Sequence, residues 1–171
     1  MTSFLDKLFG LEGRVAAITG GGGYLCGEMA RGLARAGCKI AVMDLRGHKA
    51  EDVATDITDT IGVEAIGLEI DASDKTSFAL GLDQTVAAFG RADILINGAG
   101  INAPTPFLDI TIDEFNDVIE SQITSTLLGC QIFGRHMLDQ GKGAIINISS
   151  ASAGPPLSKA FSYSIAKAGI L

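Results

Sequence analysis

The stretch that decides the fold is residues 14–44, RVAAITGGGGYLCGEMARGLARAGCKIAVMD. It opens with an apolar run, Arg14–Gly20, that passes directly into further glycines. Apolar residues then recur at helical spacing over Leu25–Ala36, and a second apolar run, Lys39–Asp44, ends on a carboxylate. Strand, glycine-rich turn, helix and strand in this order predict a parallel βαβ unit. The turn of such a unit can hold a pyrophosphate on backbone N–H groups and the helix N-terminus.

The remaining chain repeats the alternation of strand and helix. Further strands are predicted at Glu64–Ile70, Asp93–Gly98 and Gly143–Ser149. Helices are predicted at His48–Ile61, from a cap at Ser73 or Asp74 to Phe89, at Asp113–Leu138 with Thr111 or Asp113 as its cap, and at Ala160–Leu171. The pattern predicts an α/β fold, a doubly wound parallel sheet (Rossmann type), in a single domain over residues 1–171. A fifth strand without a neighbour predicts a sheet that is incomplete at its C-terminal edge.

Composition narrows the class of partner and the compartment. The chain is 47% hydrophobic and 19% charged, which is typical of a globular protein with strands buried on both faces. A net charge of −7 argues against nucleic acid and anionic membrane as partners. The start of the chain lacks the apolar centre of a signal peptide, and we expect a cytoplasmic protein. The three cysteines form no CxxC pair and are expected to be reduced, and the two histidines indicate no metal site.

A second sequence pattern, of a serine, a tyrosine and a lysine, indicates a site for proton transfer. Tyr163 and Lys167 are four residues apart in a predicted helix, so they share one face, and Ser150 lies thirteen residues before Tyr163. An ammonium one turn away stabilises a phenolate, which makes the phenol usable as an acid or base. A serine hydroxyl can hold a substrate oxygen in line with that proton. Ser149 and Ser152 are rival hydroxyls, but strand alternation puts Ser149 on the opposite face, and we favour Ser150. Alone, the tyrosine–lysine pair is also typical of an ordinary exposed helix face.

Taken together, these motifs resemble the short-chain dehydrogenase/reductase family along the whole chain. The first turn of that family reads TGxxxGxG, and Thr19 and Gly20 match it, whereas Tyr24 and Cys26 stand at the second and third glycine positions. Tyr24 is expected to fold over the cofactor or into the protein. The glycines that can supply a shifted version of the turn are Gly21, Gly22, Gly23 and Gly27.

The resemblance implies a nicotinamide dinucleotide as cofactor. Asp44, at the end of the second strand, matches the acid that binds the adenosine ribose, and it favours NAD over NADP because it repels a 2′-phosphate, which Arg46 could offset. Asp71 resembles the aspartate beside the adenine, and residues 97–100 (NGAG) resemble the family's NNAG. The implied cofactor-binding residues are Gly20, Gly21, Gly22, Gly23, Tyr24, Leu25, Asp44, Leu45, Arg46, Asp71, Ala72, Asn97, Gly98, Ala99, Tyr163 and Lys167.

The resemblance also implies the reaction. Ser150, Tyr163 and Lys167 match the family's catalytic residues, and Gln122 aligns with its catalytic asparagine. Hydride would pass reversibly between the nicotinamide and a carbonyl or secondary alcohol, with Tyr163 giving the proton and Ser150 binding the substrate oxygen. Lys167 would stabilise the phenolate and bind the nicotinamide ribose. The longer Gln122 would alter the water relay to the lysine.

The motifs leave open which substrate the protein acts on and whether the chain is active. The segments GGGGYLC, INGAG and PLSKAFSYSIAKA resemble the branch that acts on sugar acids such as mannonate or fructuronate; a polyol or a 3-oxoacyl thioester is the alternative. Family members carry further strands and a substrate-covering segment after the tyrosine–lysine helix. We therefore expect a C-terminally truncated chain that is inactive by itself. A dinucleotide-binding protein without turnover is the other alternative. Beyond the small-molecule substrate, the expected partner is a second copy, in a homodimer or homotetramer.

Overall fold

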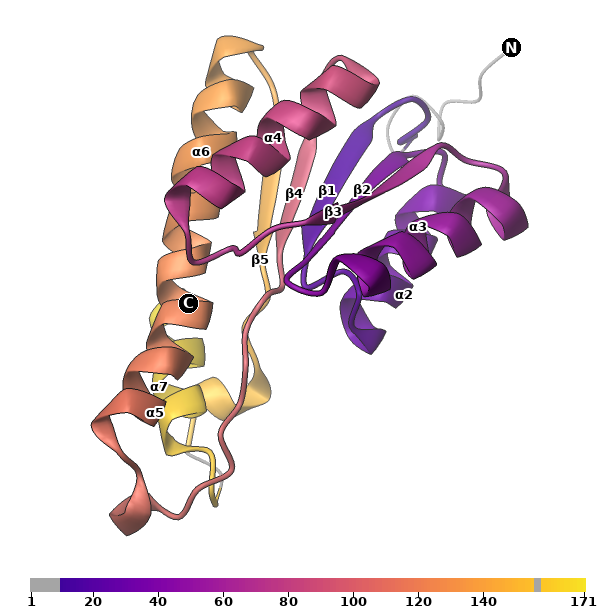
Figure 1. Ribbon diagram of the computed structural model, residues 1–171. Coiled ribbons are helices and arrows are strands. Elements are labelled where there is room, and N and C mark those ends of the chain that lie inside the picture. Colours follow the sequence, from indigo (N-terminus) through magenta and orange to yellow (C-terminus); the bar gives the residue numbers. More distant parts are fainter. Residues whose placement is uncertain (1–9, 156–157) are drawn as a thin grey trace.

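The computed structural model describes residues 10–155 and 158–171 (Figure 1). Its centre is one parallel sheet of five strands in the order β3-β2-β1-β4-β5. The strands are β1 (Val15–Thr19), β2 (Lys39–Asp44), β3 (Ala65–Glu69), β4 (Ile94–Asn97) and β5 (Ala144–Asn147). The chain winds outward from β1 to β3 and then returns to β4 on the other side of β1, so a crevice forms where β1 and β4 end. The predicted doubly wound parallel sheet is confirmed.

Helices cover both faces of the sheet. The helices α2 (Tyr24–Arg35) and α3 (Gly47–Ile61) pack on one face, and α4 (Lys75–Phe89) and α6 (Ser125–Asp139) pack on the other (Figure 1). A hydrophobic core lies on each face of the sheet, and alternate residues of β1 pack in one or the other. Ile18 faces α2 and α3, whereas Ala17 faces α4 and α6. Burial on both faces explains why the strands appear in the sequence as continuous apolar runs.

Side-chain caps settle two alternatives that the sequence leaves open. Asp74 caps α4 by accepting a hydrogen bond from the Ser77 N–H at 2.6 Å. Thr111 caps α5 (Ile112–Ile119) by accepting from the Glu114 N–H at 3.1 Å. Each bond satisfies one of the N–H groups that a helix N-terminus leaves without a partner inside the helix.

The long helix predicted at Asp113–Leu138 is not continuous. It consists of α5, a π-helical turn η2 (Glu120–Thr124) and α6. The hydroxyl of Ser125 donates to the carbonyls of Ser121 (2.6 Å) and Gln122 (3.2 Å), and Thr126 also donates to the Gln122 carbonyl (2.7 Å). Hydroxyls that bond to helix carbonyls compete with the regular backbone ladder, which accounts for the irregular turn at this place.

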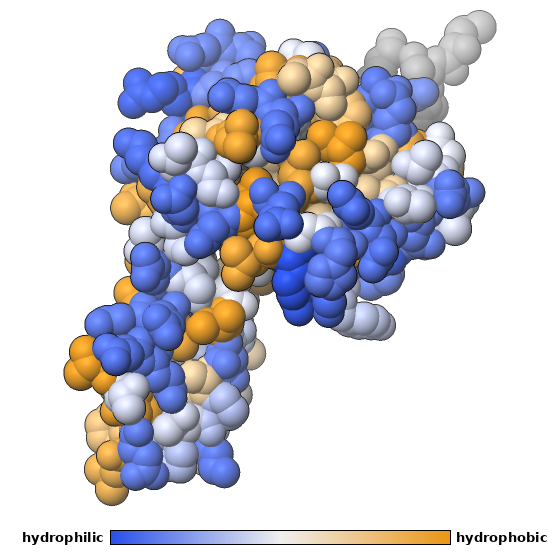
Figure 2. All heavy atoms as spheres, in the orientation of Figure 1, coloured by the Kyte–Doolittle hydropathy of each residue, from blue (hydrophilic) through white to orange (hydrophobic). Residues whose placement is uncertain are grey.

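The edge of the sheet at β5 is open within the described residues. Its Ile146 is 49% exposed, and α7 (Phe161–Ile170) packs on α5, η2 and the short turn η3 (Ala151–Ala153). Figure 1 shows α5 and α7 together beyond the carboxyl ends of β4 and β5. Figure 2 shows apolar residues gathered between α4 and α3 and again on the lower part of the molecule, where α5 and α7 lie. The exposure of Ile146 on β5 agrees with the sheet edge that was predicted to be uncovered.

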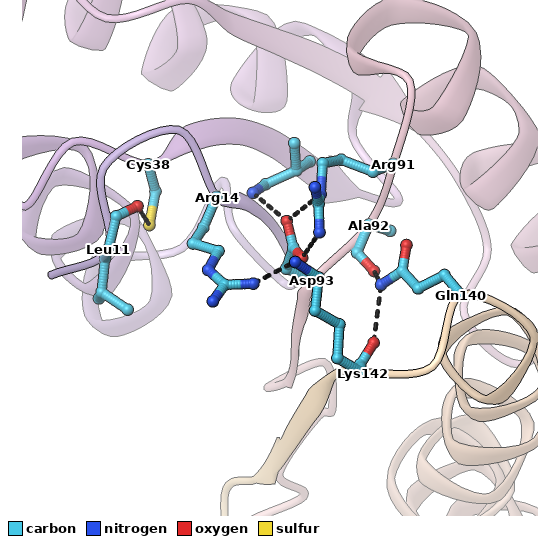
Figure 3. Close-up of polar contacts among 9 residues, drawn as sticks. Leu11, Arg14, Cys38, Arg91, Ala92, Asp93, Gln140 and Lys142 are labelled. Atoms are coloured by element: carbon cyan, nitrogen blue, oxygen red, sulfur yellow. Dashed lines mark hydrogen bonds and ion pairs between the residues drawn. The ribbon is translucent and has the colours of Figure 1, made fainter. Parts of the chain in front are cut away.

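A buried carboxylate ties β1 to β4 at the end of the sheet opposite the crevice (Figure 3). Asp93 is 3% exposed and accepts hydrogen bonds from the Val15 N–H (3.0 Å), Arg14 Nη1 (3.2 Å) and Arg91 Nε (2.7 Å), with a further bond from Arg91 Nη2. Burial acts to raise the pKa of Asp93, but the bonds and charges of Arg91, the Val15 N–H and Arg14 outweigh it and lower the pKa.

The thiols are free, as expected from the sequence. Cys26 and Cys38 are buried and Cys130 is half-buried. Nowhere in the part of the chain that the structure describes is a helix long and apolar enough to cross a bilayer.

Candidate active site

A cavity of about 620 Å³ lies in the crevice at the carboxyl ends of the strands. The predicted cofactor residues that line it are Gly20, Gly23, Tyr24, Leu25, Asp44, Leu45, Arg46, Asp71, Ala72, Gly98, Ala99, Tyr163 and Lys167. The predicted catalytic residue Gln122 lines it as well. Cys26, Ile101 and Ser121 also contribute to the wall, although the sequence motifs do not assign them to the site. Segments from both halves of the chain thus meet in one cavity.

Three residues predicted to contact the cofactor, Gly21, Gly22 and Asn97, do not line the cavity in the described structure. A Cβ on Gly21 would lie 2.7 Å from the Val42 Cγ1, so this glycine serves close packing of the turn on β2. The N–H of Gly22 donates to Asp44 Oδ2 at 3.1 Å and is not free for a phosphate. The side chain of Asn97 is buried and donates to Asn147 Oδ1 at 2.9 Å, because it faces β5. The structure thus gives each of the three a structural role, and their contact with a cofactor stays a prediction.

The glycine-rich turn leads into a helix whose N-terminus faces the cavity. Gly23 is the N-cap of α2, and no side chain of the described residues caps this end. The first N–H groups of α2 are therefore available to an anion such as a pyrophosphate. Tyr24 is 89% exposed at the cavity mouth, so the alternative in which its ring folds into the protein is wrong.

Asp44 holds the turn and the adjoining loop together. Its carboxylate is 6% exposed; Oδ2 accepts from the Gly22 N–H, and Oδ1 accepts from the Arg46 N–H (3.0 Å) and Nε (3.2 Å). Two carboxylate oxygens can accept about four hydrogen bonds, so the group retains capacity for a ligand hydroxyl. The Arg46 guanidinium, on a side chain that is 52% exposed, is paired with the same carboxylate.

Tyr163 and Lys167 lie together in the cavity wall on one face of α7. The Lys167 ammonium is 5.5 Å from the centre of the Tyr163 ring and donates to the Ile148 carbonyl at 2.7 Å. Lys167 is only 5% exposed, and burial lowers its pKa, an effect that the neighbouring Cys26 partly offsets. The Ser149 hydroxyl donates to the Lys167 carbonyl at 2.7 Å, which fixes the end of β5 to α7.

The three serines near the end of β5 have different surroundings. Ser149 is engaged with α7, which supports its exclusion as the substrate-binding hydroxyl. The Ser150 hydroxyl lies 2.8 Å from that of Ser152 and accepts from the Ser152 N–H at 3.2 Å. Ser150 is not part of the cavity wall, so its contact with a substrate oxygen stays a prediction.

Gln122 is held in the π-helical turn with no exposure to solvent. Its Nε2 donates to the Ile101 carbonyl at 2.6 Å, whereas its Oε1 is buried and has no protein partner among the described residues. A Cβ on Gly100 would lie 2.6 Å from the Gln122 Cγ. The glycine therefore makes room for the side chain that is one methylene longer than asparagine.

The cavity has no arrangement suited to a metal ion. Within residues 10–155 and 158–171, no three His, Cys, Asp or Glu side chains converge as ligands. The charged and phenolic side chains that line the cavity are the carboxylates of Asp44 and Asp71, the phenols of Tyr24 and Tyr163, the Arg46 guanidinium and the Lys167 ammonium. This set suits an organic anion and a proton transfer.

Known proteins are similar to this chain in sequence. The uncharacterized oxidoreductase UxuB of Bacillus subtilis is 38% identical over a gapped alignment of 175 residues, and the alignment covers 94% of this chain and 63% of that protein. The D-threitol dehydrogenase of Mycolicibacterium smegmatis is 32% identical over 167 residues, 98% of this chain and 64% of that enzyme. The chain thus spans less than two thirds of the length of these relatives.

Solved structures match in the same region. A crystal structure of NAD⁺-bound xylitol dehydrogenase superposes with a TM-score of 0.89 at 28% identity, covering 94% of this chain and 62% of that one. A short-chain type dehydrogenase/reductase from Mycobacterium marinum gives 0.91 at 31% identity, covering 98% and 66%. The sequence profile of the family described as short chain dehydrogenase matches residues 14–171. The chain belongs to the short-chain dehydrogenase family.

Proposed function

We propose that the protein is an oxidoreductase that transfers a hydride between a nicotinamide cofactor and a carbonyl or secondary alcohol. The observation that carries the proposal is the common cavity: Tyr163 and Lys167 form one part of its wall, and the glycine-rich turn and Asp44 form another. A proton-transfer pair and an anion-binding helix terminus serve one ligand only if they face the same space.

The residues present fit a dinucleotide. The uncapped N-terminus of α2 would receive the pyrophosphate, and Asp44 would accept from an adenosine ribose hydroxyl. Asp71 and Ala72 would border the adenine. When bound, the nicotinamide supplies or accepts the hydride. NAD(H) is the proposed form, because the Asp44 carboxylate would repel a 2′-phosphate and Arg46 is already paired with it.

The protein's own contribution is a proton at the reacting oxygen. Tyr163 would donate to the nascent alkoxide during reduction and accept from the alcohol during oxidation. Lys167, fixed by the Ile148 carbonyl, would stabilise the phenolate and contact the nicotinamide ribose. Ser150 would hydrogen-bond the substrate oxygen, and Gln122 would hold the loop after β4 through the Ile101 carbonyl.

For the substrate we propose a polyol or a sugar acid. Two similar proteins are named after polyols, D-threitol and xylitol, and the wall of the cavity that contains Tyr163 also contains the polar Ser121 and Gln122. A 3-oxoacyl thioester is the second candidate, since a 3-ketoacyl-(acyl-carrier-protein) reductase from Brucella melitensis gives a TM-score of 0.86. We further propose a cytoplasmic homodimer or homotetramer.

A two-step assay tests the proposal. NADH and NADPH are first titrated into the purified full-length protein, with cofactor fluorescence as the readout. Absorbance at 340 nm then follows turnover with threitol, xylitol, mannonate and a 3-oxoacyl thioester, in either direction. Saturable binding and turnover of a polyol or sugar acid are expected. Binding without turnover of any substrate would favour a dinucleotide-binding protein, and absence of both would overturn the proposal.

A further inference from the structure

Cys26 and Gly98 fill complementary volumes between α2 and the loop that follows β4. Cys26 is 6% exposed, and its thiol donates to the Gly98 carbonyl at 3.8 Å. A Cβ built on Gly98 would overlap the Cys26 sulfur. The sulfur therefore occupies the space that any side chain at position 98 would need. Each residue departs from the family pattern quoted above, with a larger side chain at 26 and none at 98.

The same glycine is held from a second direction. The Thr19 hydroxyl accepts from the N–H groups of Gly98 (3.1 Å) and Ala99 (3.2 Å). A Cβ on Gly20 would lie 3.1 Å from the Ala99 Cα, so the turn and the loop approach closely. The peptide group between Gly98 and Ala99 is therefore bonded to residues on both sides of the glycine-rich turn. Its N–H donates to Thr19, and its carbonyl accepts from Cys26.

We propose that Cys26 and Gly98 are a matched pair of positioning residues that sets the distance between the two cofactor-binding segments. This inference rests on the proposed function, because the ligand that would sense the distance is the dinucleotide. Gly98, Ala99 and the first turn of α2 all line the cavity. A side chain at 98 would push α2 outward and move its N-terminus away from a bound pyrophosphate.

A double-substitution cycle tests the pair. The proteins compared are the wild type, Gly98→Ala, Cys26→Ala and the double variant; alanine removes the sulfur without placing a further glycine in α2. For each, the NADH dissociation constant is measured by fluorescence, and the thermal midpoint is measured without cofactor. Gly134→Ala is the control, since the nearest atom to its new Cβ is Ile145 Cδ1 at 3.8 Å, an ordinary contact.

Gly98→Ala alone is expected to weaken NADH binding at least tenfold and to lower the midpoint. Added to Cys26→Ala, the same change should weaken binding less than threefold, because the obstructing sulfur is gone. The control should bind NADH as the wild type does. If Gly98→Ala does not fold, the double variant must still bind NADH within threefold of Cys26→Ala.

Three results would count against the pair. Equal losses of affinity in both backgrounds would show that the positions act independently and would overturn the inference. If the effects of the two substitutions on the thermal midpoint depend on each other while the NADH affinity does not change, the two residues make a packing contact only. That result would overturn the positioning role but not the proposed function. Failure of the wild type to bind NADH or NADPH would overturn the proposed function and the positioning role together.

Discussion

The ammonium of Lys167 lies 5.5 Å from the centre of the Tyr163 ring, and its hydrogen bond to the Ile148 carbonyl holds it there. The lysine is buried, so its charge is little screened by solvent and acts strongly on nearby groups. Only one of its three N–H groups has a protein acceptor among the described residues. The others remain available for a ribose hydroxyl or an ordered water.

Replacement of Tyr163 by phenylalanine should remove the proton donor and keep the ring. We expect turnover to fall by about 10²–10⁴, while NADH affinity stays within threefold of the wild type. Lys167→Met, which keeps length but not charge, should impair both. Steady-state rates and NADH fluorescence titrations check these outcomes, and a rate near that of the wild type for the phenylalanine variant would remove Tyr163 from the mechanism.

Cofactor preference should follow Asp44. The wild type is expected to bind NADH more tightly than NADPH, because a 2′-phosphate would lie against the buried carboxylate. Asp44→Ser should shift the affinity ratio toward NADPH at least tenfold, since it also releases Arg46 from its ion pair. Arg46→Ala is the matched control and should retain the preference for NADH. A wild type that binds NADPH more tightly would contradict the prediction.

The stability of the fold should depend on the charge of Asp93. Its pKa is lowered in the folded protein, so its contribution is present above the unfolded value, about 3.9, and is lost as the pH falls through the folded pKa. Asp93→Asn should lower the free energy of unfolding at pH 7 by about 2 kcal/mol. Urea unfolding at several pH values checks this, and the gap to the wild type should narrow toward pH 3. Asp83→Asn, at an exposed carboxylate of α4, should show no such gap.

Self-association should involve the exposed apolar surface of α6 and α7. Leu127 on α6 is 54% exposed and Ile165 on α7 is 40% exposed. Leu127→Lys is expected to shift a dimer or tetramer toward monomer in light scattering at micromolar concentration, because a charge would be buried at the interface. Leu80→Lys on α4, where the leucine is 53% exposed, should leave the assembly unchanged. A monomeric wild type would refute the assembly.

The strands and the glycine-rich turn could be predicted from local sequence. Lys39–Asp44 is observed as β2 with the predicted bounds, because a run of apolar residues between a glycine and a charged loop favours a strand buried on both faces. The alternation of such runs with helical periodicity then dictated a parallel sheet. Asp44, Tyr163 and Lys167 all line the cavity, since the positions of strand ends and helix faces follow from backbone periodicity.

Other features depended on contacts between segments far apart in the chain. Asn97 stands at the end of β4, where a cofactor contact was expected, yet it faces β5 because its amide pairs with Asn147 across the sheet. The long helix is interrupted at Gln122, where hydroxyls of the next turn bond to helix carbonyls, and the apolar pattern of the sequence did not predict this interruption. The sequence by itself determined which segments become strands and helices, because backbone propensity and burial act locally. Only the tertiary structure decided that the Cys26 sulfur fills the space beside Gly98, since such packing exists only once α2 and β4 are brought together.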